Sequence, residues 1–167
     1  EHYLTTKNEK FLKDTLPMCE KAISFLKHYV KDWLNLDEEE GLNKDKVKEE
    51  MEEQLKKQGK ERKTHISYDL WEMCEGIHLY SLSTVYAAFE TILKIYKVLG
   101  KNVSDFENNR LKEEKIQKNE KEIQKLMSGV KEYIDTNLYD DNKKSYVRNT
   151  EDKKMDISII GAVTPFN

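Results

Sequence analysis

Residues 78–100 read HLYSLSTVYAAFETILKIYKVLG, and this stretch decides the fold class. Its apolar side chains recur at steps of three and four residues, which places them on one face of an α-helix. That face consists of Leu79, Leu82, Tyr86, Phe89, Leu93 and Tyr96, and it is widened by Val85, Ile92 and Leu99. Ala87 and Ala88 would let another helix approach closely, and Gly100 is predicted to end the helix.

A second helical pattern occupies residues 5–34. Its apolar side chains are predicted to form one wide face, made of Met18, Ala22, Phe25, Leu26, Tyr29, Val30 and Trp33. Thr6 or Asn8 can cap the start of this segment. Because proline lacks the N–H that a helix interior uses, Pro17 suits a first turn. The sequence therefore predicts a short helix that stops near Thr15 and a longer helix that begins there.

A third long helix is predicted to start at Ser104. Its first half is almost wholly polar, and its second half has one apolar side, made of Ile123, Leu126, Met127, Val130, Tyr133 and Ile134. Residues 139–154 read as a turn-rich polar connection with a short extended piece at Tyr146–Arg148, and Asp156 can cap a short helix after it. Six glycines and two prolines leave little material for the turns of an all-β fold. The pattern predicts an all-α protein.

The composition argues against several classes of function. Charged residues make up 37% of the 167 residues but nearly cancel, to a net charge of −3. This balance gives no basic footprint for nucleic acid and no polybasic signal for a membrane surface. No apolar run approaches the length of a membrane span, and no signal peptide is visible. Since Cys19 and Cys74 lie far apart, a disulfide scaffold is not expected, and a cytoplasmic location is favoured over secretion.

Residues 37–63 form a charged excursion between the first two helical segments. Val47, Met51 and Leu55 give it only a thin apolar stripe, and its acids and lysines pair at i,i+4. The segment is either a docking arm for a partner or a solvated helical surface, and the sequence leaves both interpretations open.

Residues 64–77 have no clean period and are predicted to be a loop or a short extended segment entering a helix. Asp69, Trp71 and Glu72 crowd together there. One interpretation is a capped helix start, with Asp69 as the N-cap and Glu72 as its reciprocal partner in a capping box. The other is a site, because a carboxyl beside an indole loses hydration, which raises its pKa toward the range of a general acid. An aromatic face and a second carboxylate would suit a sugar ring.

The sequence YDLWEMCEG at 68–76, followed by the helical stretch at 78–100, resembles the acid-bearing region of glycoside hydrolase family 15, the glucoamylase type. Residues 2–30 are similar to the helix pair that precedes this region in the family. Residues 145–167, SYVRNTEDKKMDISIIGAVTPFN, look like a later family segment, in which an aspartate opens a short apolar helix ending in Pro-Phe.

The resemblance implies an (α/α)6 toroid and an enzyme that hydrolyses α-glucosidic bonds of starch- or glycogen-like oligosaccharides with inversion. Glu72 matches the general acid, which protonates the leaving oxygen. Asp69 and Trp71 match residues that line the sugar site. Many members have a second glutamate directly after the acid. This chain has Met73 there, so Glu75 is the candidate for that substrate contact. The family includes trehalose- and dextran-cleaving members, so the linkage stays open.

The general base of the family is a late glutamate that no residue of this chain matches. An inverting pair needs two carboxyls about 6.5–9.5 Å apart. Since the chain also begins with Glu1 rather than Met, we expect residues 1–167 to be part of a toroid that further segments of the same domain complete. Non-catalytic relatives in phosphorylase kinase, or a helical protein-interaction scaffold, are the alternatives.

Neither a cofactor nor a metal is expected. The glycines are scattered and form no phosphate-binding loop. Cys74 and His78 could face one metal ion at i,i+4, but a zinc site needs three or four ligands, and only His65 lies near enough in sequence to be a third.

Overall fold

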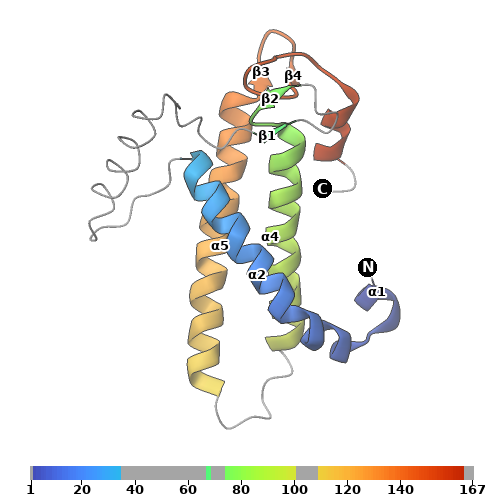
Figure 1. The fold of residues 1–167 in the computed structure, drawn as a ribbon, viewed down its shortest axis with the longest axis vertical. Helices are drawn as coiled ribbons and strands as arrows, with labels where there is room; N and C mark the ends of the chain where they lie inside the picture. Colours follow the sequence, from blue (N-terminus) through green and yellow to red (C-terminus); the bar gives the residue numbers. More distant parts are fainter. Residues whose placement is uncertain (1, 35–66, 69–73, 101–108, 164–167) are drawn as a thin grey trace, which may run out of the picture.

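The computed structural model describes residues 2–34, 67–68, 74–100 and 109–163 (Figure 1). Its elements are α1 (His2–Thr6), α2 (Glu9–Leu34), β1 (Ser67–Tyr68), β2 (Glu75–Gly76), α4 (Leu79–Gly100), α5 (Asn109–Asn137), β3 (Tyr139–Asp140), β4 (Ser145–Tyr146) and the 3-10 helix η2 (Ile157–Ala162). Most of the described residues are helical, which confirms the all-α prediction. No helix among them is both long enough and apolar enough to span a membrane. The charged excursion at 37–63 lies outside the described residues.

Three long helices form the body of the structure. α4 and α5 run antiparallel beside each other, and α2 crosses both (Figure 1). The short strands and η2 gather at one end, where α4 begins and α5 ends. The core lies between the three helices, and its largest fully buried side chains are Phe89, Leu79, Leu82, Ile92, Ile123, Leu138, Val30, Val130 and Val147.

α4 supplies most of this core, as its sequence pattern predicts. The helix ends at Gly100, and the predicted face is buried at Leu79, Leu82, Val85, Phe89, Ile92, Tyr96 and Leu99. Tyr86 and Leu93 are half-buried against the same cluster. The prediction holds because helices cover α4 from more than one side.

The prediction of two helices around Pro17 is wrong. α2 runs without interruption from Glu9 to Leu34 and contains Pro17 in its interior. The Thr15 hydroxyl donates to the Phe11 carbonyl at 2.8 Å, so side-chain bonding supports this turn. Leu16 before the proline packs against the core cluster and Ile23 after it is buried in that cluster, which holds the helix against α4 and α5. That packing outweighs the one backbone hydrogen bond that proline removes.

Asn8 is the residue that caps α2, as predicted for Thr6 or Asn8. Its Oδ1 accepts a hydrogen bond from the Phe11 backbone N–H at 3.1 Å. Thr6 lies in the preceding helix α1, and its hydroxyl donates back to the His2 carbonyl at 2.9 Å. The short helix therefore ends at Thr6 rather than near Thr15.

The buried face of α2 differs from the predicted one. Met18 and Phe25, predicted as core, are 67% and 66% exposed, and Ala22 is exposed as well. The buried positions are Leu12, Ile23 and Val30, with Leu16, Cys19, Leu26 and Tyr29 packed beside them. The apolar arc of α2 is wider than the surface that α4 and α5 offer, so part of it stays uncovered. The side chain of Trp33 lies outside the described part of the chain.

The predicted apolar side of α5 is confirmed. Ile123, Leu126 and Val130 are buried, and Met127, Tyr133 and Ile134 pack against them. The predicted start at Ser104 lies outside the described residues, and α5 is described from Asn109. After α5, β3 pairs antiparallel with β4, Tyr139 opposite Tyr146. The extended piece predicted at Tyr146–Arg148 is thus present one residue earlier, as Ser145–Tyr146.

A chain of polar contacts ties α2 to α4 and α5 along one side of the bundle. The Tyr96 hydroxyl donates to Glu20 Oε1 at 3.2 Å and accepts from Asn119 Nδ2 at 2.8 Å. Glu122 accepts from Lys27 and Lys31, each at 2.6 Å. Burial raises the pKa of Glu122, but the hydrogen bonds from both lysines lower it by more, so the net pKa falls below its usual value. The network fixes the position of α2 along its partners.

Phe89→Ala should lower the free energy of unfolding by about 3–5 kcal/mol, because it removes a fully buried aromatic ring and leaves a cavity. Urea denaturation checks the value. Met18→Ala is the control, since its exposed side chain should change stability by no more than about 0.5 kcal/mol. Equal losses in the two variants would contradict this packing.

The raised pKa of Tyr96 should make the free energy of unfolding depend on pH in the alkaline range. Burial and the neighbouring charge of Glu20 raise the pKa of Tyr96 to about 12. A raised pKa in the folded state favours the neutral phenol, so its contribution is complete below the unfolded pKa of about 10 and is lost as pH rises toward 12. Tyr96→Phe should cost about 1 kcal/mol at neutral pH, and this deficit should shrink above pH 10. A deficit independent of pH would exclude the raised pKa.

Candidate functional site

Three of the four residues predicted as the site, Asp69, Trp71 and Glu72, lie in the segment 69–73, outside the described residues. The fourth, Glu75, opens β2 and is half-buried. The site is therefore built from the residues that flank the segment on both sides and from those that hold the flanks in place.

The flanks of the segment are paired strands. β1 and β2 pair antiparallel, with Ser67 opposite Gly76 and Tyr68 opposite Glu75. The predicted short extended segment before the helix is thereby confirmed. α4 begins only at Leu79, after β2, so Asp69 and Glu72 do not cap it and the capping-box interpretation for α4 is wrong. The strand pairing instead brings the two ends of the segment together beside the start of α4.

The connection from β2 into α4 is held by the loop after β4. The Leu79 N–H donates to the Arg148 carbonyl at 2.9 Å, and the Thr150 N–H donates to the Ile77 carbonyl at 3.2 Å. His78 and Asn149 form an antiparallel bridge between these bonds. Residues that lie far apart in the sequence thus form a short sheet-like contact at the end of the bundle.

A buried polar pair lies at the centre of this contact. His78 is 2% exposed and Asn149 is 0% exposed, and Asn149 Nδ2 lies 3.0 Å from His78 Nε2. Asn149 Oδ1 accepts from the backbone N–H groups of Glu151, at 2.9 Å, and Asp152. The other amide atom is therefore the NH2 group, a donor, so His78 Nε2 accepts and carries no proton. Both ends of the Asn149 amide are used.

Gly76 is required by the same contact. Its φ of +149° belongs to a region that residues with a Cβ rarely adopt. A Cβ added at Gly76 would also lie 3.2 Å from Asn149 Cγ. The absence of a side chain lets β2 lie directly on the asparagine.

Arg148 connects this loop to Cys74, the residue immediately after the segment 69–73. Its Nη2 donates to Cys74 Sγ at 2.8 Å and to Asp152, and its Nη1 donates to Asp156 Oδ2 at 3.3 Å. The hydrogen bond from Arg148 lowers the pKa of Asp152. Burial raises the pKa of Asp156, but hydrogen bonds from Ser158 and Arg148 lower it to a net value below the usual one. Both aspartates are therefore held as anions around the guanidinium.

Asp156 also confirms its predicted role as a helix cap. Its Oδ1 accepts from the Ser158 backbone N–H at 2.8 Å, at the start of η2. Sequence reasoning missed the contribution of Arg148, Asn149 and Asp152. The one local signal was Asn149 itself, because asparagine side chains often accept hydrogen bonds from backbone N–H groups two or three residues later, as Glu151 and Asp152 do here.

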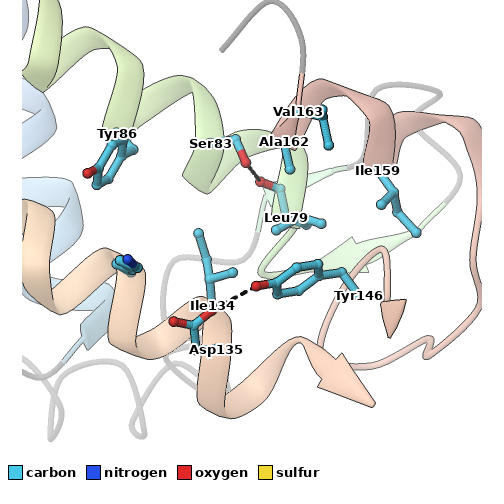
Figure 2. Close-up of a pocket in the computed structure, with 10 residues that line it drawn as sticks. Leu79, Ser83, Tyr86, Ile134, Asp135, Tyr146, Ile159, Ala162 and Val163 are labelled. Atoms are coloured by element: carbon cyan, nitrogen blue, oxygen red, sulfur yellow. Dashed lines mark hydrogen bonds between the residues drawn. The ribbon is translucent and has the colours of Figure 1, made fainter. Parts of the chain in front are cut away.

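A cavity of about 390 Å³ lies between α4, α5, β4 and η2 (Figure 2). Its walls are Leu79, Ser83, Tyr86, Lys131, Ile134, Asp135, Tyr146, Ile159, Ala162 and Val163. The Tyr146 hydroxyl points at Asp135 and donates to its Oδ1 at 2.9 Å, and the Ser83 hydroxyl donates to the Leu79 carbonyl at 2.8 Å. The Tyr146 and Ser83 hydroxyls therefore already donate hydrogen bonds within the protein, and the remaining wall of the cavity is mostly apolar. Such a cavity suits an apolar group better than a sugar ring, and Glu75 does not line it.

Within the described ranges, no group of three or more histidine, cysteine, aspartate or glutamate side chains is arranged to hold a metal ion. Cys74 Sγ accepts from Arg148, and His78 Nε2 accepts from Asn149, so both members of the i,i+4 pair already have protein partners. These hydrogen bonds give both side chains a structural role without a metal ion.

Comparisons with protein-family models, with curated proteins and with solved structures each return no match for this chain.

Gly76→Ala should lower the free energy of unfolding by about 1–3 kcal/mol, because the new methyl group meets Asn149 and the backbone is held at positive φ. Chemical denaturation with a fluorescence readout checks this. Gly100→Ala is the matched control: a Cβ there meets nothing within 4 Å, so stability should be unchanged or slightly higher. Similar losses at both glycines would exclude the close contact at Gly76.

Proposed function

We propose that this chain is the acid-bearing part of an inverting glycoside hydrolase of the glucoamylase type, acting on α-glucosidic bonds. The observation that carries the proposal is the motif YDLWEMCEG followed by the long helix α4. Glu72 is the proposed general acid, and Asp69 and Trp71 are the proposed sugar-site residues.

The geometry of the flanks supports this assignment. A catalytic carboxyl needs a chain segment that is anchored on rigid elements close to it. Here the strands on both sides of residues 69–73 are paired with each other, and the exit strand is bonded to the loop at Arg148–Thr150. The buried pair of His78 and Asn149 fixes that exit at the end of the helical body.

The proposed chemistry divides the work between this chain and the rest of the polypeptide. Glu72 donates its proton to the glycosidic oxygen as the bond to the anomeric carbon breaks. A carboxylate base supplied by another segment activates the water that attacks the opposite face of the sugar. Glu75, half-buried on β2, would accept a hydrogen bond from a substrate hydroxyl.

The proposal includes the (α/α)6 toroid. Neighbouring helices alternate in direction in such a toroid, and α4 and α5 run antiparallel side by side (Figure 1). Three large apolar side chains are exposed to solvent: Met18 and Phe25 on α2, and Ile157 on η2. Further helices of the same domain would cover these side chains, which is why we propose that the toroid extends beyond the residues described.

The exposed apolar side chains also favour a second candidate function, a helical scaffold that binds other proteins. Met18 and Phe25 lie seven residues apart on α2, a spacing that places them on one face. A scaffold would make no chemical use of Glu72, whereas the enzyme depends on it. Substitution of this carboxyl therefore separates the two functions.

The test is turnover of the longest native polypeptide that contains these residues, on maltose, isomaltose and trehalose. Glu72→Gln should lower kcat by about 10²–10⁴-fold on the cleaved substrate while the unfolding transition stays unchanged, because the amide cannot donate the catalytic proton. Glu132→Gln, on the exposed side of α5, is the matched control and should keep full turnover. No turnover on any of the three sugars, or equal turnover in both variants, would refute Glu72 as the acid.

A further inference from the structure

We propose that the cavity between α4, α5, β4 and η2 binds a small molecule with an apolar chain and a carboxylate head, such as a medium-chain fatty acid. The inference goes beyond the proposed function and does not depend on it, because the lining residues of the cavity do not include Glu75. The cavity volume of about 390 Å³ is large enough, since ligand cavities in proteins typically measure about 300–1,000 Å³.

The apolar part of the wall suits an alkyl chain. It is made by side chains from both long helices and from the end of the chain that the structure describes, namely Leu79, Ile134, Ile159, Ala162 and Val163 (Figure 2). An alkyl chain needs no hydrogen-bond partner there. A ligand rich in hydroxyl groups would lose its hydration against this wall without gaining hydrogen bonds in return.

The polar part of the wall lies at the end of the cavity away from the strands. Tyr86 lies seven residues after Leu79, the first residue of α4, which corresponds to about 10 Å along the helix. Lys131 lies six residues before Asn137, the last residue of α5. Because α4 and α5 run antiparallel side by side, Tyr86 and Lys131 lie at similar heights. This distance from the strand end matches the length of an extended octanoate molecule.

Two hydrogen-bond donors are available at this end of the cavity. Within the part of the chain that the structure describes, Lys131 Nζ forms no ion pair and the Tyr86 hydroxyl forms no hydrogen bond. An ammonium group and a phenol hydroxyl both donate, whereas a carboxylate only accepts. Hydrogen bonds between a charged donor and a charged acceptor are the stronger kind. The pair therefore favours an anionic head over a neutral one.

Asp135 is the one acid among the lining residues, and it already has a partner in the wall. Its Oδ1 accepts from the Tyr146 hydroxyl at 2.9 Å. This hydrogen bond raises the pKa of Tyr146, so the phenol keeps its proton and continues to donate. Asp135 also lies one helical turn closer to β3 than Lys131, which separates it from a head bound at Lys131. A ligand with an ammonium head would bind Asp135 instead, and this alternative predicts the opposite preference.

A titration of the full chain followed by NMR tests the chemical class of the ligand. Octanoate should bind with sub-millimolar affinity and shift the signals of Ile134 and Ala162. Hexanoate should bind about 15-fold more weakly, because each methylene group removed from an apolar site costs about fourfold in affinity. Octanol and octylammonium should bind about tenfold more weakly than octanoate, since neither is an anion. No binding of octanoate, or tighter binding of octylammonium, would overturn the proposal.

Substitutions at the polar end test the carboxylate contacts. Lys131→Met should weaken octanoate binding about tenfold and leave octanol binding within about twofold of wild type, because only the anion loses a charged partner. Tyr86→Phe should weaken octanoate binding about threefold, since the ring remains and one neutral donor is lost. Lys125→Met is the matched control, because Lys125 is exposed on α5 and does not line the cavity. Equal losses in the two lysine variants would overturn the proposal, since net charge alone would then explain binding.

A substitution that fills the cavity tests its location. Ala162→Leu should abolish binding of both octanoate and octanol, because the larger side chain occupies the space of the alkyl chain. Ile160→Leu, on the exposed side of η2, is the control and should bind octanoate as wild type does. Octanoate should raise the melting temperature of wild type and of Ile160→Leu but not that of Ala162→Leu. Full-strength binding to Ala162→Leu would overturn the proposal.

Discussion

Burial of the apolar face of α4 is the constraint on which the rest of the structure depends. α2, α5 and η2 all pack on this helix, and its first residue is bonded to the loop that holds the candidate site. A fully buried large apolar side chain contributes about 1.5–3 kcal/mol, and α4 supplies several of them. The position of α4 therefore sets the position of β2.

The sequence predicts α4 well because the three- and four-residue spacing of its apolar side chains matches the face that is buried. The faces of α4 and α5, the Asn8 and Asp156 caps and the extended segment before α4 all follow from local pattern and side-chain chemistry. Two predictions for α2 are wrong, for a common reason. The interruption at Pro17 and the burial of Met18 and Phe25 depend on which neighbours cover the helix, and local sequence carries no information about them.

The candidate site likewise has a part that local sequence predicts and a part that it does not. The proposed acid motif YDLWEMCEG is a pattern of adjacent residues, and the long helix that follows it in the sequence is predicted by its own periodicity. The hydrogen bonds that hold the end of this motif and the residues after it come from a distant part of the sequence. Arg148 and Asn149 reach Cys74 and His78 across more than 70 residues of chain, and no spacing rule predicts such a pairing. The hydrogen bonds that join the loop after β4 to the residues before α4 can be identified only when the relative positions of the helices are known.

The shortness of β1 and β2 has a consequence for thermal unfolding. Each strand has only two residues and contributes few backbone hydrogen bonds, whereas the helical body buries the largest apolar side chains. The end of the bundle that holds β2 should therefore open first on warming. Amide hydrogen exchange at Ile77 and Leu79 would then be faster than at Phe89, so heat would abolish the geometry around Cys74 before the helical body unfolds.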